Sequence, residues 1–176
     1  MFMELLVANM VGLVGLVLGK WAVFFRSDKL TKILMGLALV ISSTQYLVLG
    51  EIVGFLILSL AGIRFITFAY YKHYALLILF TFLFLATGYW TVTTPMDAIP
   101  VLMALLITFS AYYLKDMSLR LSFIVCSAMW ALYNLHCGAY VSGCADIVGI
   151  FTGLWAVHLL YRPFGRPESI SESELV

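Results

Sequence analysis

Large hydrogen-bonding side chains lie inside segments that are otherwise apolar, and such side chains could bind a polar solute. Gln45 and Asn134 carry amides, which offer both donors and acceptors to a hydroxylated molecule. Trp130 shares a helical face with Asn134, and the rings of Trp130 and Tyr133 could stack on an apolar face of the same molecule. The alternative interpretation is that the amides join helices to one another, a common role of Asn and Gln in membranes.

Two basic side chains occupy further positions in the apolar segments. Arg64 could hold a carboxylate or a phosphate through a bidentate pair, or bond backbone carbonyls or lipid phosphate instead. A charge at membrane depth is costly, which makes such a residue a candidate for function. His158 could act as a proton relay, a gate residue or an interfacial histidine. The candidate substrate-binding residues are therefore Gln45, Arg64, Trp130, Tyr133, Asn134 and His158.

The remaining reactive side chains do not form a pattern typical of an enzyme or a metal site. Cys126, Cys137 and Cys144 lack metal-ligand spacing, and His136 beside Cys137 does not complete a ligand set. Cys137 and Cys144 flank a loop in which a disulfide is chemically allowed, and small apolar filling is the alternative. Clustered acids and Ser-His pairs do not occur at one depth, so we expect no enzymatic activity, no metal and no cofactor.

Membrane-spanning helices must position these side chains. The 176 residues are 64% hydrophobic and only 11% charged, whereas a soluble domain is about a quarter charged. A spanning helix needs about 20 apolar residues, and the apolar blocks have this length. The pattern predicts an all-α integral membrane protein with seven transmembrane helices, over residues 5–25, 31–49, 52–71, 75–91, 98–114, 119–136 and 141–161.

The lysines and arginines predict the orientation of these helices. The loops after the odd-numbered helices are basic, whereas Glu4, Glu51 and Asp97 lie on the other side and Asp146 lies just inside the last helix. Basic loops face the cytoplasm, so we expect the N-terminus outside the cell and the C-terminus in the cytoplasm. Positive charges follow the first block, which indicates a retained helix and not a signal peptide. The flanking cations are Arg26, Lys29, Lys32, Lys72, Lys115, Arg120, Arg162 and Arg166.

An internal repeat relates the first three helices to the last three. A shift of 88 residues aligns Gly50 with Gly138 and Lys32 with Arg120. Past Gly50 the alignment takes an insertion of about six residues, after which Arg64 meets His158. The extra fourth helix makes the two repeats parallel, and a solute site is expected near the midplane between them. The units are a first repeat over residues 1–73, a linker helix over 74–95, a second repeat over 96–163 and a disordered cytoplasmic tail over 164–176.

Two runs carry a resemblance to a known family. They are Trp130-Ala-Leu-Tyr-Asn134-Leu-His-Cys-Gly138, and Tyr46-Leu-Val-Leu-Gly50 followed by Gly62-Ile-Arg64. They resemble the YgjV family of bacterial inner-membrane proteins, which has a Trp-x-x-His-Asn-x-x-x-Gly run in helix 6 and an Asn-Ala-Ile-Arg run in helix 3. Tyr133 stands in place of the family's His, and Ala61 in place of the first Asn.

The resemblance implies a location and a function. The YgjV family is grouped with the SWEET and PQ-loop transporters, whose fold is three helices, a linker helix and three helices. This implies a bacterial inner-membrane uniporter or facilitator that moves a small polar metabolite, such as a sugar or an organic acid, by alternating access. The alternative is a non-transport membrane scaffold or regulatory protein. The expected partners are a small-molecule solute and the lipid bilayer; a homo-oligomer stays open, and the net charge of +1 argues against nucleic acid.

Overall fold

Seven α-helices form the described part of the chain, residues 2–22, 28–71, 73–114 and 116–161 of a computed structural model, and no strand occurs in these residues. The prediction of seven helices is confirmed, with bounds that differ from the predicted ones by three residues or fewer. The predicted tail 164–176 and the cations Arg26, Lys72, Lys115, Arg162 and Arg166 lie outside the described residues. The helices are α1 Phe2–Ala22, α2 Asp28–Val48, α3 Ile52–Tyr70, α4 Tyr74–Thr91, α5 Ala98–Tyr113, α6 Asp116–His136 and α7 Tyr140–Tyr161.

Three of these helices are long and apolar enough to cross a membrane: Lys29–Val48, Ile52–Tyr70 and Tyr74–Thr91. Four more contain shorter apolar stretches: Met3–Gly19, Ala98–Ser110, Leu121–His136 and Tyr140–Trp155. Many large apolar side chains lie on the outside of the bundle, and Tyr89 and Trp90 at the end of α4 are more than 80% exposed. An apolar exterior of this kind suits contact with lipid rather than with water.

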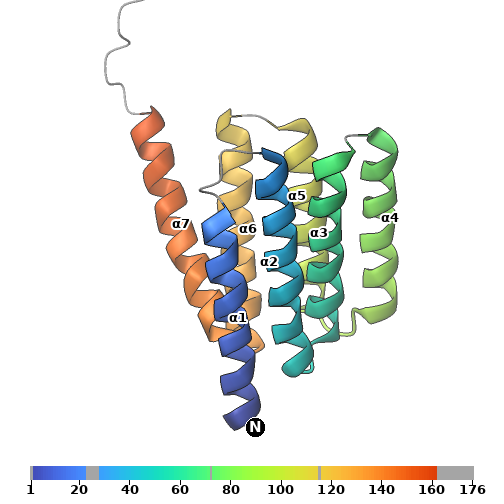
Figure 1. The fold of residues 1–176 in the computed structure, drawn as a ribbon, viewed down its shortest axis with the longest axis vertical. Helices are drawn as coiled ribbons and strands as arrows, with labels where there is room; N and C mark the ends of the chain where they lie inside the picture. The colour runs from blue at the N-terminus through green and yellow to red at the C-terminus, as the bar shows by residue number, and fades with distance from the viewer. Residues whose placement is uncertain (1, 23–27, 72, 115, 162–176) are drawn as a thin grey trace, which may run out of the picture.

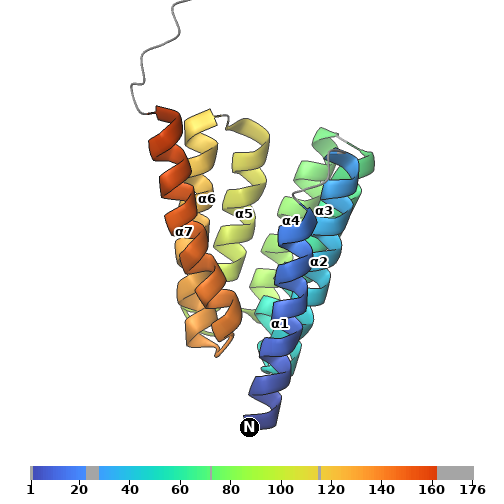
Figure 2. The same cartoon turned by 60° about the vertical axis from the view of Figure 1, so that its left-hand side comes forward.

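The helices labelled in Figure 1 form two groups that face one another, as the turned view in Figure 2 shows. In the first group α2 packs between α1 and α3, and in the second group α6 packs between α5 and α7. The groups meet where α1 packs on α7 and where α3 packs on α5. Helix α4 lies at one edge of the bundle and packs on α3 and α5. Figure 2 shows the groups close together at the end where the α6–α7 turn lies and farther apart at the opposite end.

The turns after α2 and α6 have the same construction. Gly50 and Gly138 have φ values of 79° and 83°, a left-handed conformation that glycine adopts without a Cβ penalty. The next backbone N–H in each turn bonds back into the helix, from Glu51 to the Tyr46 carbonyl and from Ala139 to the Asn134 carbonyl, both at 2.8 Å. These are helix ends of the Schellman type. We call the end of the bundle that holds both turns the glycine-turn end.

The insertion expected after Gly50 does not occur at this turn. Helix α3 begins at Ile52 and α7 begins at Tyr140, so the glycines and the helix starts keep one offset. Six extra residues would lengthen a helix by about 9 Å, yet α7 has 22 residues and α3 has 19. If the offset of 88 residues is kept along α7, Thr152 and not His158 is the residue of α7 at the position of Arg64 in α3.

Glycines bring the helices of the first group close together. A Cβ at Gly62 would lie 2.6 Å from the carbonyl oxygen of Gly36, so α2 and α3 touch backbone to backbone. A Cβ at Gly15 of α1 would lie 2.0 Å from the Ser42 hydroxyl of α2. Small residues at such contacts are typical of packing between membrane helices. This packing fixes the faces of α2 and α3 that turn toward the second group.

Candidate functional site

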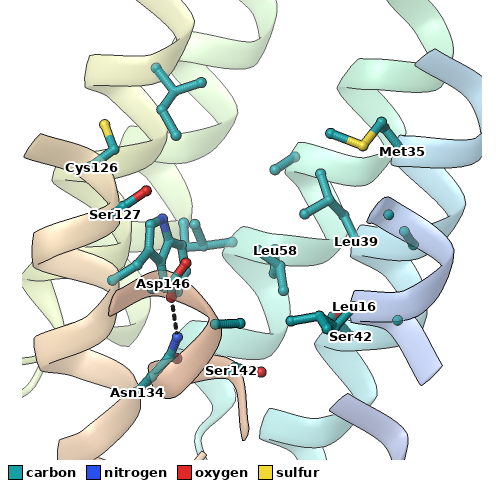
Figure 3. A pocket seen from close by; sticks show the side chains of 18 of the residues that line it. Leu16, Met35, Leu39, Ser42, Leu58, Cys126, Ser127, Asn134, Ser142 and Asp146 are labelled. Atoms are coloured by element: carbon teal, nitrogen blue, oxygen red, sulfur yellow. Dashed lines mark hydrogen bonds between the residues drawn. The ribbon is translucent and has the colours of Figure 1, made fainter. Parts of the chain in front are cut away.

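A cavity of about 400 Å³ lies between the two groups (Figure 3). Side chains from α1, α2, α3, α5, α6 and α7 line it, and most of them are apolar. Its volume falls within the range of about 300 to 1,000 Å³ that is typical of small-molecule sites. A few polar side chains on an apolar wall are also typical of such sites. The polar side chains that line it are Ser42, Tyr46, Arg64, Ser127, Trp130, Asn134, Ser142 and Asp146.

Asn134 connects three helices at one end of the cavity. It lies in the last turn of α6 and is only 2% exposed. Its side-chain nitrogen donates to Oδ2 of Asp146 on α7 at 2.8 Å, as Figure 3 shows. Its side-chain oxygen accepts a hydrogen bond from the Tyr46 hydroxyl on α2. The chain of bonds from Tyr46 through Asn134 to Asp146 therefore crosses from the first group to the second.

Aromatic rings form the wall beside Asn134. Trp130 lies one turn away on α6 and lines the cavity, as expected from its spacing to Asn134. Its ring centroid lies 6.3 Å from that of Tyr46 and 5.8 Å from that of Tyr133. Tyr133 is fully buried behind this wall, and its hydroxyl donates to Glu51 at 3.4 Å. The structure therefore places Trp130 on the cavity and Tyr133 in the contact between the groups.

Gln45 lies between helices and not on the cavity wall. Its side chain is fully buried, and its oxygen accepts a hydrogen bond from the Ser142 hydroxyl of α7 at 2.8 Å. Gly12 of α1 makes room for it, because a Cβ there would lie 2.1 Å from the same oxygen. Its Nε2 has no hydrogen-bond partner among the described residues. A buried donor that lacks a hydrogen bond costs about 1 to 3 kcal/mol of stability.

Several hydrogen bonds between the two groups lie at the glycine-turn end, whereas the bond between Arg64 of α3 and Thr108 of α5 lies deeper in the bundle. The side chain of Asn9 on α1 binds the α6–α7 turn with two hydrogen bonds. It donates to the Gly138 carbonyl at 3.2 Å and accepts from the Val141 N–H at 3.0 Å. The bonds of Gln45, Tyr46 and Tyr133 described above lie at the same end. These hydrogen bonds join the two groups at the glycine-turn end, and we call them the closing network. They are made by the side chains of Asn9, Gln45, Tyr46, Tyr133 and Ser142.

Arg64 lies deeper, on the wall that α3 contributes. The residue is 4% exposed, and its guanidinium donates to the hydroxyl of Thr108 on α5. The guanidinium carbon lies 5.2 Å from the ring centre of Phe65 and 5.9 Å from that of Phe84. A cation at membrane depth costs about 2.5 to 3.5 kcal/mol on insertion scales. A hydroxyl and two aromatic faces lower this cost without supplying a counter-charge.

His158 is not brought to the cavity. It lies on an exposed face of α7, with its ring 6.2 Å from that of Trp155. Asp146, in contrast, was predicted only as an acid near the outer end of the last helix, and its side chain lines the cavity. Its place as the seventh residue of α7, about two turns into the helix, was the signal that could have identified it. Tyr46 was part of the run that carried the family resemblance, and its position 88 residues before Asn134, the offset of the repeat, was the further signal that could have identified it.

Of the three cysteines, Cys126 lines the cavity, and Cys137 and Cys144 do not. Cys126, Cys137 and Cys144 are all free thiols, so Cys137 and Cys144 form no disulfide in this structure. Within the described ranges, no group of three or more His, Cys, Asp or Glu side chains could hold a metal ion.

A bundle of apolar helices around a cavity with buried polar side chains defines a helical membrane protein. The family of YgjV-type bacterial inner membrane proteins matches residues 6–163, and the chain belongs to this family. The resemblance seen in the Trp130–Gly138 run is thereby confirmed, and the chain is a bacterial inner membrane protein. No curated protein and no solved structure shows significant similarity to it.

Proposed function

We propose that this protein is a transporter, a uniporter or facilitator that moves a small polar metabolite across the bacterial inner membrane. The observation that carries the proposal is the cavity between the two groups, closed at one end by hydrogen bonds that join the groups. A scaffold has no need of a cavity of ligand size in its centre. The partners of the protein in this proposal are the solute and the lipid bilayer, and its side chains carry out no catalysis.

The two groups act in this proposal as parallel repeats in a 3+1+3 arrangement, with all seven helices spanning the membrane and α4 as the linker. The equal construction of the turns at Gly50 and Gly138 supports this. The packing supports it as well, because α1 on α7 and α3 on α5 are equivalent contacts if α1–α3 repeat as α5–α7. We extend the relationship to the SWEET and PQ-loop transporters on the same grounds.

Alternating access follows if the groups rock against one another. In transporters of parallel repeats, a fixed site between the repeats is exposed to each side in turn. The closing network holds the glycine-turn end together, while the groups diverge toward the other end (Figure 2). With the N-terminus outside the cell, the glycine-turn end faces outward, so this is an inward-open arrangement. Opening to the outside requires that the closing network break.

The solute in this proposal lies against Asn134 and Trp130. Asn134 offers an amide at the cavity wall, and Trp130 offers a broad ring surface one turn away. Gln45 and Tyr133, which the sequence also suggested, act in the closing network, and Arg64 lines the deeper part of the cavity. Polar groups of this kind fix the orientation of a ligand whose remaining surface contacts apolar walls.

Solute release from proteoliposomes tests the proposal. Vesicles that contain the purified protein are loaded with a bacterial metabolite extract, and mass spectrometry records which solutes leave. We expect selective release that is lost in Trp130→Ala and kept in Trp155→Ala, because Trp155 is 64% exposed on α7 and absent from the cavity wall. Folded protein that releases no solute, or equal activity of the two variants, would contradict the proposal and favour a scaffold.

A further inference from the structure

Arg64 places a buried cation on the cavity wall. The residue is 4% exposed, and it lies six residues, or about 9 Å, before the end of α3 at Tyr70. In the described part of the chain its guanidinium donates to the side-chain hydroxyl of Thr108 and not to a backbone carbonyl. Burial at this depth also keeps it from lipid phosphate. The space that its charge faces is therefore the cavity.

The guanidinium keeps donors for a ligand. It carries five N–H donors in a planar fork, and the Thr108 hydroxyl accepts from one nitrogen, Nη1. That hydroxyl donates to the Ala104 carbonyl, so a lone pair and not its proton faces Arg64. The ring partners that the described residues supply are Phe65 and Phe84. All of these partners are neutral, and a fixed cation with neutral partners favours an anionic group, which would form a bidentate, charge-assisted pair with it.

Asp146, the acid on the same wall, lies nearer the glycine-turn end. It is the seventh residue of α7, Arg64 is the thirteenth residue of α3, and both helices begin at that end. The difference of six residues corresponds to about 9 Å along the bundle. Asp146 is also engaged already, because it accepts the hydrogen bond from Asn134 (Figure 3) and takes part in a further interaction. The charged group of the solute is thus placed at Arg64 and not at Asp146.

The wall between Arg64 and Trp130 calls for an apolar body. Arg64 lies twelve residues from the glycine-turn end of α3, and Trp130 lies six residues from the same end of α6. The difference is about 9 Å along the bundle, of which the Arg64 side chain covers a part because helical side chains lean toward the N-terminus. Apolar side chains such as Leu39 and Leu58, labelled in Figure 3, line the cavity beside these two residues. An apolar body several atoms long fills this space with a gain from burial.

We infer that the solute is a monocarboxylate with an apolar body, whose carboxylate binds Arg64 and whose far end lies against Trp130. This assignment rests on the proposed function, because it names the substrate class of the same cavity. Among the described residues that line the cavity, Arg64 is the only cation, so one negative charge on the solute matches it. A phosphate group carries about −1.5 to −2 charge at pH 7, which is more than one guanidinium neutralises.

Four small probes test the inference. The full-length protein in lipid nanodiscs is titrated with γ-phenylbutyrate, γ-phenylbutyramide, phenylpropylphosphonate and acetate, and binding is followed by the rise in melting temperature. The first three share a phenylpropyl body that ends in a carboxylate, a neutral amide or a phosphonate, and acetate is a carboxylate without the body. We expect γ-phenylbutyrate to bind at least about tenfold more tightly than each of the others. The amide is a strict control, because a neutral molecule enters the lipid of the nanodisc more readily than an acid.

Variants of the cation show whether Arg64 binds the carboxylate. Arg64→Gln should abolish the preference for γ-phenylbutyrate over its amide. Arg64→Lys should keep a part of it, because lysine keeps the charge but not the planar fork. Lys29→Gln is the matched control and should leave the preference unchanged. It removes a cation that lies 4.1 Å from the ring centre of Tyr70, away from the residues that line the cavity.

Several outcomes would overturn the inference. They are no binding of γ-phenylbutyrate by the unmodified protein, equal binding of the amide or acetate, tighter binding of the phosphonate, or a preference that survives in folded Arg64→Gln protein. If Arg64→Gln does not fold, the ranking on the unmodified protein and the Arg64→Lys variant decide. Solute release from proteoliposomes is measured separately. Release of neutral solutes alone would support transport and reject the carboxylate, whereas binding of γ-phenylbutyrate without release of any solute would support the carboxylate site and reject transport.

Discussion

The Tyr46 hydroxyl donates a hydrogen bond to the side-chain oxygen of Asn134, and the two residues lie 88 positions apart in the chain. The same offset separates Gly50 from Gly138, the two glycines with positive φ. If α1–α3 repeat as α5–α7, two residues at this offset occupy equivalent positions in the two repeats. Equivalent residues can touch only close to the pseudo-symmetry axis that relates the repeats. The bond thus lies where rocking of the groups would change contacts most directly.

The bond between Tyr46 and Asn134 is expected to couple stability and transport. A double-mutant cycle with Tyr46→Phe and Asn134→Ala should give a coupling free energy of about 0.6 kcal/mol, the average for hydrogen bonds between membrane helices. Asn134→Ala should also abolish solute release. Ser43→Ala is the control, because it removes a bond at 2.8 Å to Ser59 inside the first group and should leave release intact. A coupling energy near zero would show that the bond does not form.

Length and hydropathy were sufficient to predict the helices. Short polar stretches such as Gly50-Glu51 and Lys115-Asp116 separate apolar blocks that are long enough to cross a bilayer. Such blocks form helices in a membrane because a helix pairs its backbone N–H and C=O groups within the segment. The predicted positions of Trp130 and Asn134 on one face followed from helical spacing alone. Both line the cavity.

The other residues of the site could not be predicted, because they depend on the rotation of each helix about its axis. The sequence of a helix that is apolar on every face does not show this rotation. Every face of α7 is apolar enough for lipid, so the sequence could not show that Asp146 turns inward and His158 outward. The sequence suggested Gln45 as a solute-binding residue, but its side chain is buried against Gly12 and Ser142. That burial depends on how α1 and α7 approach α2, which the sequence does not show. The insertion that was predicted after Gly50 but is absent from the turn had a similar cause, since apolar helices align at many offsets.

The left-handed glycine at the α2–α3 turn predicts a purely local cost. A Cβ at Gly50 would meet no atom within 4 Å, so Gly50→Ala strains the backbone and clashes with nothing. The left-handed conformation costs a non-glycine residue about 1 to 2 kcal/mol, and the free energy of unfolding should fall by this amount. Gly50→Asn is the control and should cost less, since Asn tolerates this conformation better. Equal losses for Ala and Asn would contradict the backbone explanation.

The contact between Gly36 and Gly62 predicts a larger, steric cost. Gly62→Ala places a methyl group 2.6 Å from a backbone oxygen, which cannot move away without shifting α2. Overpacking of this kind costs about 1 to 3 kcal/mol, and the melting temperature should fall accordingly. Gly149→Ala is the matched control on α7, where the new methyl would make an ordinary contact of 3.8 Å with Ser127. A stable Gly62→Ala protein would show that α2 and α3 pack less closely than described.

Reporter fusions test the orientation on which the inward-open arrangement depends. A reporter active only in the cytoplasm should be active after Val176 and silent in the α4–α5 loop at Asp97, because basic loops stay inside. A second reporter, active only outside the cytoplasm, should give the opposite pattern at both sites. Activity of the cytoplasmic reporter at Asp97 would mean that the glycine-turn end faces inward, and the cavity would then be open to the outside.

The α4–α5 loop should contribute an acid-sensitive part of the stability. Asp97 Oδ2 accepts hydrogen bonds from the Thr93 and Thr94 N–H groups at 3.0 and 2.8 Å and from the Thr93 hydroxyl at 2.9 Å. Partial burial favours a higher pKa, but these bonds outweigh it and hold the pKa of Asp97 below its usual value of 3.8. A lowered pKa in the folded state means that the stabilisation is present above pH 3.8 and is lost as the pH falls through the lowered pKa.

Melting temperatures measured from neutral pH down through this range should therefore fall more for the unmodified protein than for Asp97→Asn. The difference between the two proteins removes the contribution of the other carboxylates, which they share. Thr93→Ala is the second variant: it removes the hydroxyl donor, so the pKa of Asp97 rises toward its usual value and the loss of stability begins at a higher pH. Parallel melting curves for the unmodified and Asp97→Asn proteins across the acid range would show that the folded loop does not favour the charged carboxylate.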